Sequence, residues 1–223
     1  MNPNTAHPGL DAVILDYNGV IGVQPTIGQW RHLAGIAAWP KEDLTAFQTA
    51  FWSAREPYDA GQLSDPAYWS RVLGHHPGPR MLRELRAADT DMWTTTDENV
   101  VDVLRYAHRA GVPMVLLSNA PAHLSDVLDT HPWRHLMTQA LYSARLGVCK
   151  PDPAAYRHAL AATGVAVPQR VLFVDDRADN CHAARRLGLR TLHYTGRVAD
   201  LEAALLPAGR PRHLPCPTSS GAA

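Results

Sequence analysis

The chain has 223 residues, enough for one α/β domain with a sizeable insertion. Its 21 Lys and Arg residues balance 21 Asp and Glu residues, so net charge does not point to a nucleic-acid or membrane-surface partner. No apolar run approaches the length of a membrane span, and residues 1–10 lack the apolar core of a signal peptide. The three cysteines, Cys149, Cys181 and Cys216, are few and widely separated, which predicts a reducing compartment. We therefore expect a cytoplasmic protein that binds neither nucleic acid nor membrane. The composition leaves its oligomeric state open.

A short apolar run at residues 12–15 predicts a buried strand, preceded by a loose arm at residues 1–10. The run ends at Asp16, and Asn18-Gly19 then predicts a turn. Open α/β sheets bind ligands beyond the carboxyl ends of their strands, so Asp16 is a candidate site residue. An Asp that only caps a loop would leave the same local pattern.

The next seventy or so residues carry a helical pattern. Apolar side chains recur at helical spacing at positions 30, 33, 34 and 37, and again at 44, 47 and 51. Ser64-Asp65-Pro66 predicts the start of a further helix. We interpret the aromatic residues concentrated here as the core of a small helical bundle rather than as an aromatic ligand site.

From residue 95 onward, helical and apolar strand patterns alternate, which predicts a parallel sheet with right-handed crossovers. Strands are expected at residues 114–117, 138–142, 171–174 and 190–193, with helices at 121–128, 154–163 and 180–187. Beyond Leu206 the chain is rich in Pro, Gly, Ser and Arg, so we expect residues 207–223 to be disordered.

Polar residues follow three of the predicted parallel strands and should meet at one sheet edge. They are Asp16, Ser118 and the pair Asp175-Asp176, with Lys150 on a loop that reaches the same edge. Clustered carboxylates raise one another's pKa, so three of them need compensating positive charge. Lys150 supplies one charge, and a hard divalent cation such as Mg²⁺ would supply the rest. Taken alone, the acidic pair would equally suit a helix N-terminus.

Four stretches, ILDYNGV, VLLSNA, CKPDPAAY and VLFVDDRADN, occur in an order that resembles the haloacid dehalogenase-like hydrolase superfamily. The resemblance covers residues 11–22 and 95–206, and implies a Rossmann-like parallel sheet core in an α/β fold. Residues 23–94 are similar to the α-helical cap domain that one subfamily inserts after the first core strand.

The resemblance implies covalent catalysis on a small phosphorylated substrate. Asp16 would attack phosphorus to form an aspartyl-phosphate, which water then hydrolyses. Ser118, Asn119 and Lys150 would hold the phosphoryl group. The implied Mg²⁺ ligands are Asp16, the backbone carbonyl of Asn18, Asp175 and Asp176, with Asn180 supporting them. Arg31 and Arg55 in the expected cap are candidates for contacting an anionic substrate, although exposed helix charges would give the same pattern.

One position departs from the family's phosphatases. They usually carry a second Asp two residues after the nucleophile, and this Asp protonates the leaving group. Here that position is Asn18, whose amide does not exchange a proton at neutral pH. General acid–base help is typically worth about 10²–10⁴ in rate. We therefore expect slow turnover of alkyl phosphates, unless water, the substrate or another side chain supplies the proton.

The departure leaves two alternatives open. A metal-independent 2-haloacid dehalogenase of the same superfamily also lacks the second Asp and shares Ser118-Asn119 and Lys150 with Tyr156, because halide leaves without a proton. Against it, dehalogenases typically carry neutral polar residues where this chain has Asp175-Asp176. A catalytically weak binding protein is the other alternative, and the intact Asp16, Ser118 and Lys150 argue against it.

Overall fold

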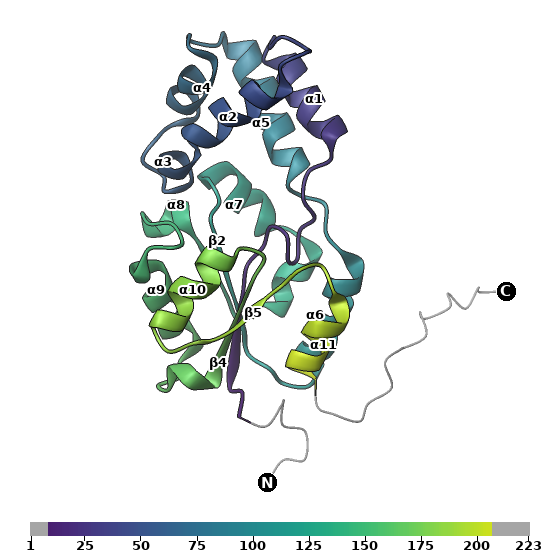
Figure 1. Cartoon of the computed structure of the whole chain (residues 1–223), viewed down its shortest axis with the longest axis vertical. Coiled ribbons are helices and arrows are strands. Elements are labelled where there is room, and N and C mark those ends of the chain that lie inside the picture. Colours follow the sequence, from purple (N-terminus) through teal and green to yellow (C-terminus); the bar gives the residue numbers. More distant parts are fainter. Residues whose placement is uncertain (1–8, 207–223) are drawn as a thin grey trace, which may run out of the picture.

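The computed structural model describes residues 9–206, which form an α/β core with a helical insert at one end (Figure 1). Five parallel strands lie in the order β3-β2-β1-β4-β5. Their bounds are β1 Ala12–Leu15, β2 Met114–Ser118, β3 Gln139–Tyr142, β4 Val171–Asp175 and β5 Arg190–His193. Each predicted strand is confirmed to within one residue at either end. Because all five run in the same direction, their carboxyl ends share one edge.

Alternate residues of the central strand β1 face opposite layers of helices. Val13 and Leu15 belong to one apolar cluster, and Ala12 and Ile14 belong to the other. The first cluster includes residues of α6 (Glu98–Arg109), α7 (Ala122–Leu128), η1 (Pro132–Leu136) and α11 (Val198–Leu205). The second includes residues of α9 (Pro153–Thr163) and α10 (Ala178–Arg186). Both faces of the sheet are therefore covered, which explains why β1, β2 and β4 are entirely buried. The remaining short elements of the core are α8 (Ser143–Leu146) and η2 (Pro168–Arg170).

The helical insert lies between β1 and α6 in the chain. Its helices are α1 Ile27–Ile36, α2 Leu44–Ser53, α3 Arg55–Asp59, α4 Asp65–Leu73 and α5 Pro79–Met92. Thr26 begins α1 with a capping box completed by Gln29. Phe47, Phe51 and Trp69 are fully buried. The Trp30 and Phe51 rings pack edge to face with centroids 5.0 Å apart. Most of the aromatic residues therefore form the bundle core that the sequence predicts, whereas Trp52 is 50% exposed.

Two linkers that lie side by side join the insert to the core. The Val23 amide donates to the Thr95 carbonyl at 3.0 Å, and the Asp97 amide donates to the Ile21 carbonyl at 2.9 Å. A second contact lies away from the linkers, where the Ser143 hydroxyl of α8 donates to the Asp59 carbonyl of α3 at 2.5 Å.

The expected N-terminal arm and C-terminal tail fall mainly at residues 1–8 and 207–223, outside the described residues, as does Cys216. Leu10, which the sequence places in the arm, is instead buried in the core. Within residues 9–206, no helix has both the length and the apolar character that a membrane crossing requires.

Candidate active site

Adjacent strands β1 and β4 place two buried carboxylates beside each other. The Asp16 amide donates to the Val174 carbonyl at 2.9 Å, and Asp175 is the last residue of β4. The Lys150 ammonium lies between the two carboxylates, with Nζ 2.7 Å from Asp16 Oδ1 and 2.8 Å from Asp175 Oδ2. The Lys150 side chain is only 1% exposed. The structure thus brings together three residues that lie as much as 159 positions apart in the chain.

Further hydrogen bonds fix the orientation of the Asp175 carboxylate. It accepts from the Arg177 backbone amide at 2.8 Å and from Asn180 Nδ2 at 3.0 and 3.1 Å. Asn180 comes from the first turns of α10, directly after β4. Together with the Lys150 ammonium, these donors surround a fully buried carboxylate and hold it in one orientation. Asn180 thus contacts Asp175, one of the carboxylates that the resemblance implies as a metal ligand.

Asn119 positions Lys150. Its Nδ2 donates to the Lys150 carbonyl and its Oδ1 accepts from the Lys150 amide, both at 2.8 Å. The side-chain amide of Asn119 is thus bonded at both ends to the backbone of Lys150, so the prediction that Asn119 holds the phosphoryl group rests on its backbone amide. Ser118, at the carboxyl end of β2, is buried at the same edge of the sheet.

Asp176 completes an acidic group that we call the acidic triad, formed by Asp16, Asp175 and Asp176. One oxygen from each lies within 4.8 Å of the others. Gly19 turns the chain beside it at a φ of +75°, and a Cβ there would come within 2.1 Å of Asp176 Oδ2. Glycine is required at this position by both its φ and the lack of space. Three hard oxygen donors at this spacing fit a divalent cation that completes its coordination with water and substrate oxygens, as Mg²⁺ does.

The electrostatics of the triad also favour a cation. Burial raises the pKa of Asp16 to about 8; the Lys150 ammonium opposes this shift and the negative charge of Asp175 adds to it. Burial and the charge of Asp175 likewise raise the pKa of Asp176. Burial opposes the charge on Lys150, but Asp16 and Asp175 outweigh it and raise the pKa of the ammonium. One ammonium among three carboxylates leaves a net negative site, which a divalent cation would offset.

Asn18 lies at the edge of this site. Its Nδ2 donates to Gln24 Oε1 at 3.3 Å, and its Oδ1 is buried without a hydrogen-bond partner among residues 9–206. A buried amide oxygen without a donor is unusual in a folded protein. It leaves an acceptor next to the acidic triad that a ligand or water could satisfy.

Sequence reasoning missed Gln24. While its Oε1 accepts from Asn18, its Nε2 donates to Asp176 Oδ2 at 3.0 Å. Gln24 thus joins the turn after β1 to the carboxylate after β4, across 152 positions of sequence. The only indication in the sequence was that Gln24 lies a few residues after the first motif. A single glutamine in a linker does not by itself predict a contact with the active site.

The two arginines expected to meet an anionic substrate have different positions. Arg31 is exposed on α1. Arg55 is 5% exposed, and its guanidinium pairs with Asp59 at 2.8 Å and with Asp89 at 3.0 Å. The prediction for Arg55 is corrected, because its charge is held by two carboxylates inside the insert and stacks against Phe51.

Comparisons with known proteins place the chain in a family. The family profile of the haloacid dehalogenase-like hydrolases matches residues 10–188. The chain is 26% identical to a sesquiterpene phosphatase of Aspergillus oryzae over 84% of this chain and 91% of that protein. It is 31% identical to a phosphoglycolate phosphatase of Pseudomonas putida, over 52% of this chain and 44% of the relative.

Solved structures show the same fold. A HAD family enzyme of Bacteroides thetaiotaomicron, in complex with magnesium and inorganic phosphate, aligns with a TM-score of 0.67 at 16% identity, covering 84% of this chain and 96% of that one. The L-2-haloacid dehalogenase of Xanthobacter autotrophicus, with chloropropionic acid covalently bound, aligns with a TM-score of 0.60 at 18% identity, covering 82% and 76%. The family resemblance and the fold class predicted from the sequence are both confirmed. The chain belongs to the haloacid dehalogenase-like hydrolases.

Proposed function

We propose that this protein is a magnesium-dependent phosphatase that hydrolyses a small phosphorylated metabolite in the cytoplasm through an aspartyl-phosphate at Asp16. The observation that carries this proposal is the acidic triad around the Lys150 ammonium. Three carboxylates at this spacing are electrostatically unfavourable unless a cation joins them. The phosphatase names of relatives and the magnesium and phosphate in a solved neighbour are in accord with it.

In this proposal the chain's own residues position the reactants. Asp16 Oδ attacks phosphorus, the ester oxygen leaves with its electron pair, and water later attacks the aspartyl-phosphate to release phosphate and restore the carboxylate. Lys150 holds the nucleophile in place and stabilises negative phosphoryl oxygens, and the Ser118 hydroxyl donates to another. Asp16, the Asn18 carbonyl, Asp175 and Asp176 would hold Mg²⁺, which when bound supplies positive charge to the phosphoryl oxygens.

Asn18 limits the leaving groups that the enzyme handles well. Its side-chain amide donates to Gln24 and carries no proton that it could transfer at neutral pH. Substrates whose alcohol or acid leaves readily as an anion need no such proton. We therefore expect acyl or aryl phosphates to react faster than alkyl phosphates.

We also propose that residues 23–94 act as a cap over a core made of residues 11–22 and 95–206. The paired linkers and the α3–α8 contact support this division. The substrate would then bind between the two parts.

Asn18 also favours a second candidate, a metal-independent 2-haloacid dehalogenase. A halide leaves without protonation, so the absence of a proton donor at position 18 would not slow the reaction. Two carboxylates beside Asp16 count against it, because without a cation they would repel the nucleophilic carboxylate.

The test compares turnover of acetyl phosphate and p-nitrophenyl phosphate with Mg²⁺ and with a chelator. Magnesium-dependent release of phosphate, abolished in Asp16→Asn, supports the phosphatase. Asp102→Asn on the exposed face of α6 is the matched control and should retain wild-type turnover. Metal-independent chloride release from 2-chloropropionate would instead support the dehalogenase. No turnover of any of these compounds would favour a binding protein.

A further inference from the structure

An open cavity of about 710 Å³ lies between the linker and the first two helices of the insert. Gln24 and Trp30 line it on one side. On the other side α2 contributes Thr45, Gln48, Thr49, Trp52 and Ser53. None of these side chains carries a charge.

The α2 residues share a single helix face. Their spacing of three and four positions places them on one side of the helix, while Phe47 and Phe51 are buried on another side in the insert core. The Thr49 and Ser53 hydroxyls donate to carbonyls of their own helix, at 2.9 and 2.8 Å, which leaves their oxygens as acceptors. The face therefore offers an aromatic surface with a few weak polar groups.

Large apolar side chains are exposed on the linker and the first two helices of the insert. Trp52 is 50% exposed, Ile27 is 56% exposed and Val23 is 37% exposed. Of the exposed large apolar residues in the described part of the chain, only Val167 lies elsewhere, on the core. Exposed apolar groups gathered in one place indicate a binding surface more strongly than scattered ones. Trp52 is also held in position, with its ring 6.1 Å from that of Trp30 and 6.0 Å from that of Trp93.

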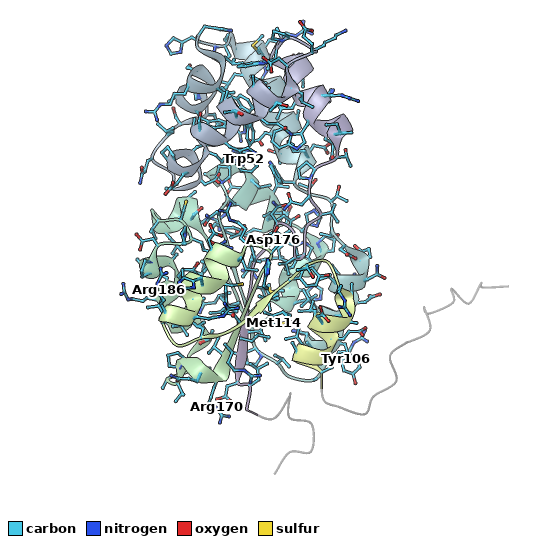
Figure 2. All side chains as sticks on the ribbon, in the orientation of Figure 1. Trp52, Tyr106, Met114, Arg170, Asp176 and Arg186 are labelled. Atoms are coloured by element: carbon cyan, nitrogen blue, oxygen red, sulfur yellow. The ribbon has the colours of Figure 1, made fainter. Side chains whose placement is uncertain are left out.

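The cavity and the acidic triad are linked by Gln24, which lines the cavity and also donates to Asp176 at 3.0 Å. Trp52 lies at the end of the insert nearest the core, and Asp176 lies at the facing end of the core (Figure 2). Gln24 is therefore the side chain at which a molecule bound to the acidic triad would meet the cavity.

We infer that the cavity binds the organic part of the substrate, and that this part is uncharged and largely apolar. The inference rests on the proposed phosphatase function and narrows its substrate class. A carboxylate on the substrate would lie against Trp52 without meeting a cation, because no cavity-lining side chain is positively charged. An apolar or aromatic group would instead cover the exposed Trp52 ring.

Two aryl phosphates of the same shape test the inference: 4-propylphenyl phosphate and its carboxylated counterpart, 3-(4-phosphonooxyphenyl)propanoate. Their phenol leaving groups are alike, so the missing acid at Asn18 affects both equally. We expect kcat/KM to favour the propyl compound by about tenfold or more. Trp52→Ala should lower kcat/KM for the propyl compound by about tenfold, mainly through KM, and Trp52→Phe should restore most of it.

A charge placed in the cavity gives an independent readout. Gln48→Lys should shift the preference towards the carboxylated compound by about tenfold, since it supplies the missing cation. Gln169→Lys, the same substitution on an exposed core position far from the insert, should leave the preference unchanged. An equal or reversed preference in the wild type, or no response to Gln48→Lys, would overturn the inference.

Failure of the inference is distinguishable from failure of the proposed function. If acetyl phosphate is hydrolysed with Mg²⁺ but the two aryl phosphates react equally, the proposed phosphatase function is supported and the inference that the cavity binds an apolar group is refuted. If nothing is hydrolysed, calorimetric titration with the two corresponding aryl phosphonates still tests the cavity. Tighter binding of the propyl phosphonate then supports it, and equal binding or none refutes it.

Discussion

Replacing Lys150 with Met removes the ammonium that lies between two buried carboxylates. Each Nζ–carboxylate contact, at 2.7 and 2.8 Å, corresponds to about 6 kcal/mol of attraction at an effective dielectric constant of about 20. Much of this attraction offsets the cost of burying the charges. Breaking a buried pair by removing one partner typically costs about 3–5 kcal/mol, and we expect the free energy of unfolding to fall by that amount.

Urea unfolding followed by tryptophan fluorescence measures this loss, with and without Mg²⁺. Without the ammonium the acidic triad is more negative, so Mg²⁺ should bind more tightly and recover more stability in Lys150→Met than it adds to the wild type. Phosphatase activity should fall by about 10²–10³ even with saturating Mg²⁺, because charge stabilisation at the phosphoryl group is lost.

Arg80→Met is the control, since it breaks an ion pair with Glu84 that is largely exposed to water. Its free energy of unfolding should stay close to the wild-type value, and Mg²⁺ should affect it as it affects the wild type. If Lys150→Met is as stable as Arg80→Met without Mg²⁺, or if Mg²⁺ adds no more stability to it than to the wild type, the electrostatic account of the acidic triad is wrong.

Three further outcomes are expected. Asn18→Asp should raise turnover of alkyl phosphates more than that of aryl phosphates, because only the former need a proton donor; steady-state rates on both classes check this, and equal responses contradict it. The affinity for Mg²⁺ should rise from about pH 6 towards pH 8, because burial raises the pKa of Asp16 to about 8 and this carboxyl must lose its proton to bind the cation. Calorimetric titration across this interval measures the change, and a constant affinity would contradict it. Asn119→Leu, which releases the backbone of Lys150, should lower kcat by about 10²-fold while KM changes little, and a purely structural role would instead show as lost stability without this kinetic change.

The amino-acid sequence by itself determined the framework on which the site is built. Buried apolar runs identified β1, β2 and β4. The alternation of helices with strands placed the two edge strands, β3 and β5, whose sequences are partly polar and only partly buried. Parallel strands end at one edge, so the convergence of Asp16 with Asp175-Asp176 followed from their positions alone. The substitution at Asn18 was equally visible, because it needed only a count of two residues from Asp16.

The tertiary structure alone decided what each side chain contacts around that framework. Asn119 bonds to the backbone of Lys150, and Arg55 is buried between two carboxylates. Gln24 reaches Asp176, and Trp52 stands exposed beside it on the insert. These pairings depend on how the insert helices pack and where the linkers run, and packing of this kind joins residues far apart in the chain without leaving a periodic pattern in the sequence.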